Sequence, residues 1–420
     1  MPGDKSIAHR AAMIAALAER SSRIINFPNN ADCEGTLSCL AKLGVSIKRR
    51  DRELLVRGGG VEGLRASSEP LDCRNSGTTM RLLAGILAGR NFKSTLTGDE
   101  SLRARPMARI IEPLRMMGAR ISSDDGRAPL VIEGHKPLKA INYELPVASA
   151  QVKSCVLLAG LSAEGRTELI ESSVTRDHSE RMLRWFGVPL EVREVEGLRT
   201  VTVDGPARFK ARDVSIPGDI SSAAYFIAAA ALLPGSSLEI TNVGVNPTRV
   251  MFLEQLRSSG FDVAVSEVRE QCNEPVGTIC VSGSRSSASD FESATLRGPL
   301  IPQLIDELPL LAVVGSQIEG GIEIRDAAEL RAKESDRIAT TVENLRAMGA
   351  TVEEFDDGLR VSGPTQLLGA AIDTQGDHRI AMAFTVAGLI AEGETKIKDA
   401  ECVAVSFPEF FDLLQSGVER

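Results

Sequence analysis

The feature that most constrains the fold is a short pattern that occurs six times along the chain. Each copy closes an amphipathic helical stretch with Leu, three variable residues and Gly: LAKLG at 40–44, LRMMG at 114–118, LRWFG at 183–187, LRSSG at 256–260, LRAMG at 345–349 and LLQSG at 413–417. The copies follow one another at intervals of roughly 68 to 89 residues. Such a period indicates a repeated supersecondary unit. We therefore expect six similar units in an α/β chain.

Each copy also predicts local geometry. Its Gly suits the left-handed position that follows the last turn of a helix. In the first five copies an alternating apolar strand, a polar turn and a second strand come next, which predicts a β-hairpin. Residues 351–361, with a turn at Asp356, Asp357 and Gly358, are an example. The sixth copy is truncated.

Every unit also holds an earlier stretch made almost wholly of small and apolar residues. This composition favours helices that are buried on all sides, at 7–18, 77–88, 151–161, 222–233, 305–314 and 379–390. Three units to a globule predict two lobes, residues 5–216 in the first and residues 1–4 and 217–420 in the second. The hinge is expected near Ile216 and Pro217.

Composition excludes several classes of protein. A chain of 420 residues exceeds one comfortable core, in keeping with two lobes. The net charge of −9 argues against a nucleic-acid binder. Seven cysteines, an odd number without a Cys-x-x-Cys pair, favour a reducing compartment over a disulfide framework. Without an apolar run of membrane length or a leader, we expect a cytoplasmic monomer away from membranes, a removed transit peptide being the alternative.

Polar and charged residues stand at the fronts of the expected buried helices. They are Lys5, Ser6 and Arg10; Asn75, Thr78 and Arg81; Ser149 and Gln151; Asp219 and Ser221; Asp306 and Glu307; Asp377, His378 and Arg379. A single polar residue there is usually a cap. Cations, however, are disfavoured at a helix N-terminus unless an anion is present. We therefore expect a polyanionic ligand in a cleft between the lobes.

Three further segments carry charge. If residues 331–337 begin the helix that ends at Gly349, Lys333 and Arg337 lie on one face at i, i+4, and Glu334 and Arg337 meet at i, i+3. The carboxylate of Glu334, held between these cations, is then a proton donor, or the segment is a solvated face with surface ion pairs. Asp306, in a largely apolar run, is either a cap or a general base. Arg105 precedes Pro106, which can occupy the first turn of the next helix.

These residues also carry a family resemblance. The motifs PGDKSIAHR at 2–10, NSGTTMR at 75–81, residues 98–106, SAQ at 149–151, RAKESDR at 331–337, DHR at 377–379 and SFPEF at 406–410 resemble 5-enolpyruvylshikimate-3-phosphate (EPSP) synthase, in order along the whole chain. The resemblance implies a two-lobed enolpyruvyl transferase fold with three βαβαββ units in each lobe. It also implies transfer of the enolpyruvyl group of phosphoenolpyruvate to the 5-hydroxyl of shikimate 3-phosphate, with release of phosphate.

The resemblance further implies roles for single residues. Asp306 would be the base and Glu334 the acid, with Lys5 as the third catalytic group. The residues implied to bind shikimate 3-phosphate are Lys5, Ser6, Arg10, Ser149, Ala150, Gln151, Arg176, Asp306 and Lys333. Those implied to bind phosphoenolpyruvate are Lys5, Gly77, Arg105, Gln151, Arg337 and Arg379. No metal or redox cofactor is implied.

Some positions depart from the family pattern. The chain starts at its first motif, where relatives carry a strand, so part of a sheet in the second lobe is expected to be missing. Arg74 stands where the family usually has Gly, and Val405 where some relatives have Lys, as in a second class of the family. Gly77 is kept where glyphosate-insensitive members of that class have Ala, which leaves the inhibitor response open.

Two other functions compete with this one. One is the sister reaction, which moves enolpyruvyl onto a UDP-amino sugar; its opening motif has Asn after Lys, and it uses a loop Cys. Here Ser6 follows Lys5, and no Cys lies in residues 98–106. The other is a catalytically idle relative that only binds anions, which the truncated start and Arg74 leave open.

Overall fold

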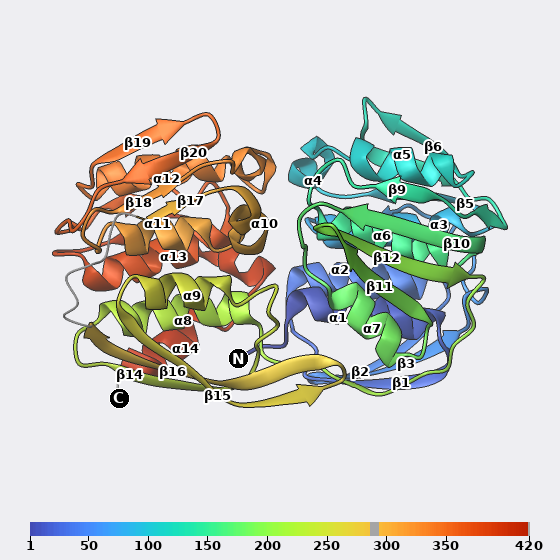
Figure 1. The fold of residues 1–420 in the computed structure, drawn as a ribbon, viewed down its shortest axis with the longest axis horizontal. Helices are drawn as coiled ribbons and strands as arrows, with labels where there is room; N and C mark the ends of the chain where they lie inside the picture. Colours follow the sequence, from blue (N-terminus) through green and yellow to red (C-terminus); the bar gives the residue numbers. More distant parts are fainter. Residues whose placement is uncertain (286–293, 419–420) are drawn as a thin grey trace. The chain divides into compact units, whose positions relative to one another are not determined.

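The chain folds into two compact units. The computed structural model describes residues 1–285 and 294–418. The first unit comprises Pro2–Pro217 and Glu270–Glu274, and the second comprises Met1, Gly218–Arg269 and Pro275–Arg420. Figure 1 shows the first unit mainly in blue and green and the second mainly in yellow, orange and red.

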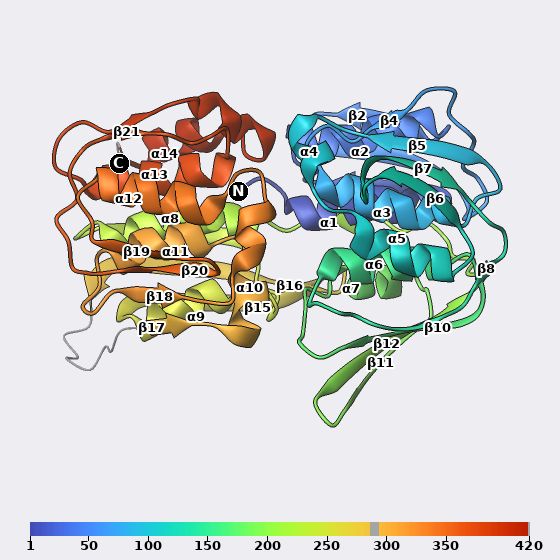
Figure 2. The same cartoon turned by 90° about the horizontal axis from the view of Figure 1, so that it is seen from above.

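The first unit is built around three buried helices, α1 (Lys5–Leu17), α3 (Gly77–Ala88) and α6 (Ala150–Gly160). Helix α3 packs against both α1 and α6, and Figure 2 shows the three inside the unit. The remaining helices are α2 (Ala31–Lys42), α4 (Glu100–Ala104), α5 (Ala108–Met116) and α7 (His178–Trp185). The apolar composition of α1, α3 and α6 thus corresponds to burial on all sides.

Three mixed sheets cover these helices. The first runs β13 (Val214–Ser215), β1 (Glu19–Ile25), β3 (Glu53–Gly59), β2 (Ser46–Arg50). The second runs β4 (Leu71–Asp72), β5 (Lys93–Thr97), β7 (Arg127–Glu133), β6 (Arg120–Asp124). The third runs β11 (Leu190–Val195), β12 (Leu198–Gly205), β10 (Ala163–Glu171), β8 (Leu138–Lys139), with β9 (Asn142–Glu144) also on β10. Each sheet joins one hairpin to a parallel pairing.

The second unit repeats this plan around α8 (Ile220–Leu232), α11 (Leu308–Gly315) and α13 (His378–Ile390), which contact one another. The other helices are α9 (Met251–Ser258), α10 (Ile301–Leu304), α12 (Arg337–Ala347) and α14 (Phe410–Val418), with the 3₁₀ turns η1 (Gly298–Leu300), η2 (Ala328–Ala332) and η3 (Ala400–Val405).

Its sheets have three, four and two strands. One runs β14 (Ser237–Gly244), β16 (Glu274–Arg285), β15 (Phe261–Gln271). The next runs β17 (Ala294–Leu296), β18 (Ile322–Ile324), β20 (Gly358–Val361), β19 (Val352–Phe355), and a third pairs β21 (Ala371–Ile372) with β22 (Lys396–Ile397).

The predicted α/β repeat is confirmed, and so is most of its local geometry. Five of the six pattern glycines have φ between 83° and 106°, and each precedes one of the five hairpins. Gly417 differs, because it lies inside α14 rather than after it. The first unit takes the opening strand of its first sheet from β13, which pairs in parallel with β1.

Two expected helices begin later than predicted. Residues 305–307 form a turn, and α11 starts at Leu308, directly before Pro309. Proline disfavours the helical conformation of the residue before it but fits the first turn of a helix. Helix α12 starts at Arg337 rather than at Arg331, because the side chain of Asp336 accepts hydrogen bonds from the backbone N–H groups of Ile338 and Ala339 and caps the helix there.

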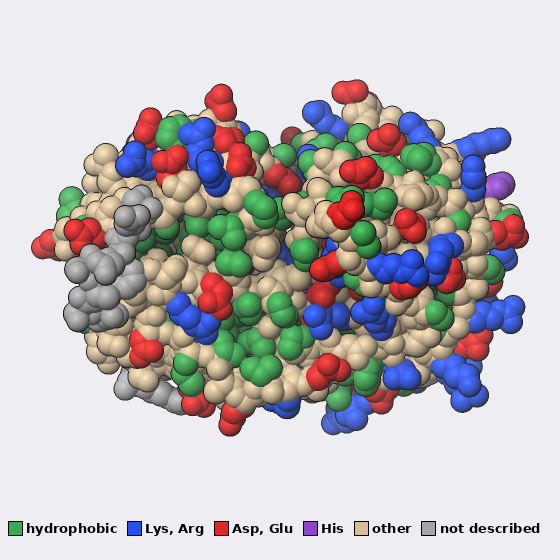
Figure 3. Space-filling view, in the orientation of Figure 1, with side chains coloured by type: hydrophobic (Ala, Val, Ile, Leu, Met, Phe, Trp, Pro, Cys, Tyr) green, Lys and Arg blue, Asp and Glu red, His purple; other side chains and the backbone are tan. Residues whose placement is uncertain are grey.

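Figure 3 shows Lys and Arg side chains interspersed with Asp and Glu over the face in view. Within residues 1–285 and 294–418, no single helix is long and apolar enough to cross a bilayer. One pair, Gly298–Leu304 with Leu308–Gly315, passes that test of length and composition when joined, with a bend of 107°.

Candidate active site

The fronts of the buried helices are capped by side chains. Asp4 accepts a hydrogen bond from the backbone N–H of Ile7 at 2.9 Å ahead of α1. Ser149 accepts one from the backbone N–H of Val152 ahead of α6. Ser76, Asp219 and Asp377 cap α3, α8 and α13 in the same way. Capping thus accounts for these five polar residues and leaves the neighbouring cations to be explained.

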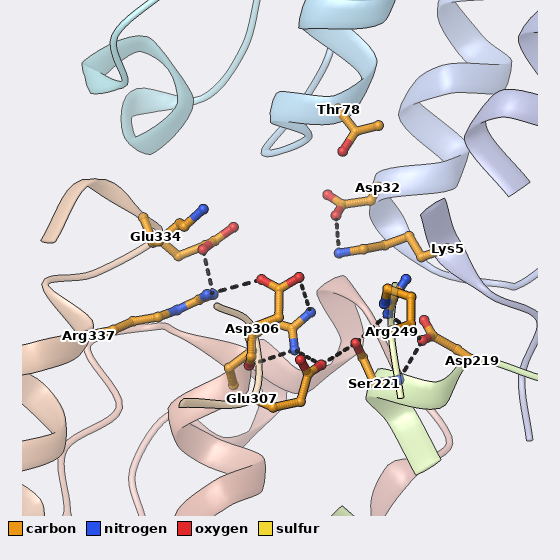
Figure 4. Close-up of polar contacts among 12 residues, drawn as sticks. Lys5, Asp32, Thr78, Asp219, Ser221, Arg249, Asp306, Glu307, Glu334 and Arg337 are labelled. Carbon is orange, nitrogen blue, oxygen red and sulfur yellow. Dashed lines mark hydrogen bonds and ion pairs between the residues drawn. The ribbon is translucent and has the colours of Figure 1, made fainter. Parts of the chain in front are cut away.

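Lys5 is the first residue of α1, and a carboxylate holds its ammonium group. Its Nζ lies 2.8 Å from Oδ2 of Asp32, in the first turn of α2 (Figure 4). The two side chains are 20% and 10% exposed. Asp32 offsets the unfavourable position of a cation at a helix N-terminus. Sequence analysis did not identify Asp32, because the two residues are 27 positions apart.

Arg10 joins three segments of the first unit. Its side chain is buried, and it donates from Nε to Ser179 Oγ at 2.7 Å, from Nη1 to the backbone oxygen of Ser6 at 2.8 Å, and from Nη2 to Ser154 Oγ at 2.9 Å. Burial lowers the pKa of Arg10 to about 10, while Glu180 and Asp4 oppose that effect. Arg10 therefore fixes the front of α1 against α6 and α7.

The fronts of α3 and α6 are joined through Gln151. Its Oε1 accepts a hydrogen bond from Arg81, and its Nε2 donates to Thr78 Oγ1 at 3.0 Å. Gly77 opens α3 beside this contact: a Cβ placed there would lie 2.7 Å from Nη1 of Arg81 and 3.5 Å from Nη1 of Arg105. Gln151, Gly77 and Arg105, expected as site residues, are thus neighbours. Arg81 was expected only at a helix front.

Arg105 occupies a different local position from the one expected. It is the residue after the last turn of α4, and α5 begins only at Ala108, so Pro106 lies outside that helix. Nη2 of Arg105 donates to Asn75 Oδ1 at 2.8 Å and to Ser101 Oγ at 3.2 Å. These bonds connect Arg105 to the loop before α3.

That loop also contains Arg74, which departs from the family pattern. Its φ is 53°, in the left-handed region that favours glycine. The backbone oxygen of Arg74 accepts a hydrogen bond from the N–H of Asp99 at 2.9 Å. The loop therefore keeps a conformation suited to Gly although Arg stands there.

Arg176 is partly buried and lies in the segment that follows β10, next to a residue that a buried ionic network contacts. The Nζ of Lys153 lies 2.8 Å from Oε1 of Glu180 and 3.0 Å from Oε1 of Glu171, and Arg199 contacts both carboxylates. Nζ of Lys153 also donates to the backbone oxygen of Thr175 at 3.4 Å. The network fixes the residue directly before Arg176.

In the second unit, Asp306 lies in the turn before α11 and contacts two arginines, Arg337 and Arg379. Figure 4 shows the contact with Arg337. Its Oδ2 is 3.5 Å from Nη2 of Arg379 and its Oδ1 is 3.8 Å from Nη1 of Arg337. Its backbone oxygen accepts a hydrogen bond from Nη1 of Arg379 at 2.9 Å. The side chain of Glu307, the residue that precedes α11, does not cap that helix. Asp306 was expected to be either a helix cap or a general base. Its ion pairs with Arg337 and Arg379 favour a role in a charged site over a role as a cap.

Arg337 is the most enclosed cation of this cluster, with a side chain that is 2% exposed. Its Nη2 lies 2.5 Å from Oε2 of Glu334, and its Nε donates to Oδ2 of Asp377 at 2.8 Å. Burial lowers the pKa of Arg337, but Asp377 and Glu334 outweigh it and raise that pKa overall. Burial also lowers the pKa of Arg379, but Asp306, Tyr225 and Glu307 outweigh it and raise that pKa overall. Both arginines are therefore charged.

The expected helical face at residues 333–337 is wrong, although one of its contacts exists. Lys333 and Glu334 precede α12, so they do not share a helical face with Arg337. Glu334 still meets Arg337, as the spacing indicated. Nζ of Lys333 instead lies 3.2 Å from Oε1 of Glu329, in a partly exposed pair. Both side chains are partly exposed, but Lys333 pairs away from Arg337, whereas Glu334 contacts it.

The predicted residues thus fall into two groups, one in each unit. Lys5, Ser6, Arg10, Gly77, Arg105, Ser149, Ala150, Gln151 and Arg176 belong to the first unit, and Asp306, Lys333, Glu334, Arg337 and Arg379 to the second. Within residues 1–285 and 294–418, no cluster of three His, Cys, Asp or Glu residues suits a metal ion. Lys5, Arg10 and Arg105 in the first group and Lys333, Arg337 and Arg379 in the second contact carboxylates or polar oxygens, and such cations can also bind anionic ligands.

Comparison with known proteins gives the class of this protein. Residues 1–414 match the family model of EPSP synthase (3-phosphoshikimate 1-carboxyvinyltransferase). In fold the chain is similar to the EPSP synthase of Acinetobacter baumannii, with a TM-score of 0.85 and 40% identity, covering 99% of this chain and 94% of that one. The fold is therefore that of the two-lobed enolpyruvyl transferases.

Relatives in sequence narrow the class to one family. A 3-phosphoshikimate 1-carboxyvinyltransferase of Koribacter versatilis is 52% identical over 419 residues, covering 100% of this chain and 96% of the relative. Another, from Salinibacter ruber, is 51% identical over 418 residues, covering 99% and 95%. The chain belongs to the EPSP synthase family.

Proposed function

We propose that this chain transfers the enolpyruvyl group of phosphoenolpyruvate to the 5-hydroxyl of shikimate 3-phosphate, and releases phosphate. The observation that carries the proposal is the family match over residues 1–414, together with charged clusters at the predicted positions of both units. Two phosphates and two carboxylates bring up to about six negative charges, taking each phosphate at up to roughly −2. Cations and helix N-termini at those positions can balance such charge.

The residues proposed to bind shikimate 3-phosphate are those that the family resemblance implies, and their residue types and local contacts support the assignment. Lys5, Ser6, Arg10, Ser149, Ala150, Gln151 and Arg176 come from the first unit, and Asp306 and Lys333 from the second. Arg10 already donates to Ser6, Ser154 and Ser179, which gives it a second task of ordering the segments that carry the other ligands. The network around Lys153 holds Thr175, the residue directly before Arg176.

Phosphoenolpyruvate is assigned to Lys5, Gly77, Arg105, Gln151, Arg337 and Arg379. Arginine suits this substrate because its planar guanidinium can donate two parallel hydrogen bonds to a carboxylate or a phosphate. The absence of a side chain at Gly77 leaves room beside Arg81 and Arg105. These features support a site for a small molecule that carries two anionic groups, a phosphate and a carboxylate.

Asp306 is the proposed base, and Glu334 the proposed acid. Asp306 takes the proton of the 5-hydroxyl while the oxygen bonds to C2 of phosphoenolpyruvate, and Glu334 donates a proton to C3. The product of this addition is a tetrahedral intermediate. In the second step C3 returns its proton to Glu334, the bond between C2 and the bridging phosphate oxygen breaks, and inorganic phosphate leaves with the proton that Asp306 had taken from the 5-hydroxyl. General acid–base assistance of this kind contributes a factor of about 10² to 10⁴.

The contact between Glu334 and Arg337 supports the acid role. An arginine at 2.5 Å favours the ionised carboxylate. When the anionic substrate engages Arg337, the hold on Glu334 weakens, because both anions use the same guanidinium. Glu334 then binds a proton more readily, so arrival of phosphoenolpyruvate supplies the acid that its addition needs.

Two acceptors test the proposal directly. Phosphate release from phosphoenolpyruvate is measured with shikimate 3-phosphate and, in parallel, with UDP-N-acetylglucosamine. We expect release with the first acceptor only. Release with the UDP-sugar alone would assign the sister reaction, which the family match does not favour, and a folded sample without turnover on either acceptor would be an anion-binding relative.

We also propose that the chain works as a monomer in a reducing compartment, the cytoplasm. Its seven cysteines are free thiols, and four of them, Cys33, Cys39, Cys73 and Cys155, are buried. Light scattering during gel filtration tests the oligomeric state, and a single species near the chain mass of 44.9 kDa is expected. Neither a membrane nor a nucleic acid takes part in the proposed reaction.

A further inference from the structure

We infer that Glu307 is a positioning residue for Arg379, and that Ser221 and Arg249 hold Glu307 in place. This inference rests on the proposed function, in which Arg379 binds phosphoenolpyruvate. None of Glu307, Ser221 and Arg249 is among the predicted binding or catalytic residues. All of these residues lie in the second unit.

Glu307 directs its carboxylate away from its own helix. It directly precedes α11, yet it makes no side-chain cap there. Its side chain is buried, its Oε1 accepts a hydrogen bond from the hydroxyl of Ser221, and the same oxygen lies 3.7 Å from Nη1 of Arg379. Burial of a carboxylate is costly unless it is paired and hydrogen-bonded. Glu307 meets both conditions only through α8 and α13, so its contacts are specific to this arrangement.

The hydroxyl of Ser221 has a fixed direction in this chain of contacts. Nη2 of Arg249 donates to Ser221 Oγ at 2.6 Å. Arginine can only donate, and an ionised carboxylate can only accept. The single hydroxyl hydrogen of Ser221 must therefore point to Glu307. Arg249 is itself buried and lies 3.6 Å from Oδ1 of Asp219, the cap of α8.

The far end of this chain is the guanidinium of Arg379. Asp306 contacts it through the backbone oxygen at 2.9 Å and through Oδ2 at 3.5 Å. Glu307 contacts the same Nη1 through its carboxylate. Figure 4 shows Ser221 between Arg249 and Glu307. Glu307 and Asp306 each contact the guanidinium of Arg379. Glu307 thus adds a second hold on Nη1 of Arg379, and we expect that without its charge the guanidinium keeps only its contacts with Asp306 and loses the orientation that binds the substrate.

Steady-state kinetics of phosphate release on the full chain test this inference. Phosphoenolpyruvate is varied at saturating shikimate 3-phosphate, and then the reverse. Glu307→Gln keeps the shape of the side chain and removes its charge. We expect KM for phosphoenolpyruvate to rise about tenfold, the effect of losing one charge-assisted contact, while KM for shikimate 3-phosphate stays within about twofold.

A second variant removes the support of Glu307 without touching its charge. Ser221→Ala should raise KM for phosphoenolpyruvate by roughly threefold. Because Ser221 acts through Glu307, the double variant should resemble Glu307→Gln alone rather than multiply the two effects. Ser316→Ala is the matched control: it removes another buried hydroxyl, bonded to Val313 at the opposite end of α11, and should leave both KM values unchanged.

The outcomes separate the two proposals. A wild-type chain without turnover overturns the proposed function, and this inference with it. With an active wild type, an unchanged KM for phosphoenolpyruvate in Glu307→Gln, equal rises in both KM values, or multiplicative effects in the double variant each overturn the positioning role. If Glu307→Gln does not fold, Ser221→Ala decides by the same split between the two KM values.

Discussion

Nη2 of Arg337 lies 2.5 Å from Oε2 of Glu334, while Nε of the same guanidinium donates to Asp377 at 2.8 Å. One buried arginine therefore holds the proposed acid on one side and the cap of α13 on the other. The buried carboxylate of Asp377 anchors Arg337 through Nε and Nη2, whereas Glu334 and Asp306 contact Arg337 from partly exposed positions. The proposed function couples substrate binding and acid catalysis through this residue.

Glu334→Gln should lower kcat by a factor on the order of 10² or more, because the amide cannot donate a proton to the methylene carbon. KM for phosphoenolpyruvate should change much less, since Arg337 keeps its charge. Initial rates of phosphate release measure both. Glu354→Gln, which removes a carboxylate from an exposed pair with Arg331, is the control. A Glu334→Gln enzyme with wild-type kcat would remove Glu334 from the chemistry.

Gly77→Ala should weaken binding of phosphoenolpyruvate. The new Cβ would lie 2.7 Å from Nη1 of Arg81, so the arginine must shift and loosen its hydrogen bond to Gln151. We expect KM for phosphoenolpyruvate to rise about tenfold, with little loss of stability because the arginine end is flexible. Gly417→Ala, where a Cβ meets nothing within 4 Å, is the control. Equal KM values in the two variants would contradict this account.

Lys153→Met should destabilise the first unit. It removes a cation that contacts the buried carboxylates of both Glu171 and Glu180, and breaking a buried ionic network costs about 3 kcal/mol or more. Urea unfolding followed by the fluorescence of Trp185, the single tryptophan, reports on this unit.

The control for Lys153→Met is Lys93→Met, in the same unit. It breaks an exposed pair with Glu133 and should cost under about 1 kcal/mol. If Lys153→Met lowers the free energy of unfolding no more than this control does, the network has no structural role.

His9 should make stability fall in mild acid. Burial lowers the pKa of His9 to about 3 in the folded chain, helped by Lys5 and Arg10 and opposed by Asp32, whereas the ordinary pKa is about 6.5. The unfolded chain therefore binds a proton that the folded chain refuses, and stability is lost as the pH falls through the window from about 6.5 to about 3.

At pH 5 this loss amounts to about 2 kcal/mol relative to pH 7.5. Urea unfolding of the wild type and of His9→Gln at the two pH values isolates the contribution, because the variant lacks this group. An identical pH dependence in both chains would show that His9 takes up no proton on unfolding.

The fold could be predicted to the level of repeats, because the signals for them are local. Glycines such as Gly44 and Gly349 must take a left-handed conformation where a helix ends, and the strands that follow alternate in polarity. Helix starts were less predictable. The late start of α11 depends on Pro309, and that of α12 on the cap by Asp336, and both signals compete with the apolar or charged pattern around them.

The site was predictable in its cations but not in their partners. A lysine or arginine at a helix front is visible in the sequence. Lys5 and Asp32 are 27 positions apart, however, and Arg337 and Asp377 are 40 apart, so only tertiary packing brings them together. Glu307 stood beside Asp306 in an apolar run, yet its direction toward Ser221 and Arg379 depends on the turn that replaces the expected helix.

Phosphorus-31 NMR of phosphoenolpyruvate, shikimate 3-phosphate and the purified chain tests the central claim most directly. The account predicts that the phosphoenolpyruvate signal disappears only when shikimate 3-phosphate is present, while inorganic phosphate and one new phosphate monoester appear in equal amounts. Loss of phosphoenolpyruvate without the acceptor, or an unchanged spectrum with a folded chain, would contradict it.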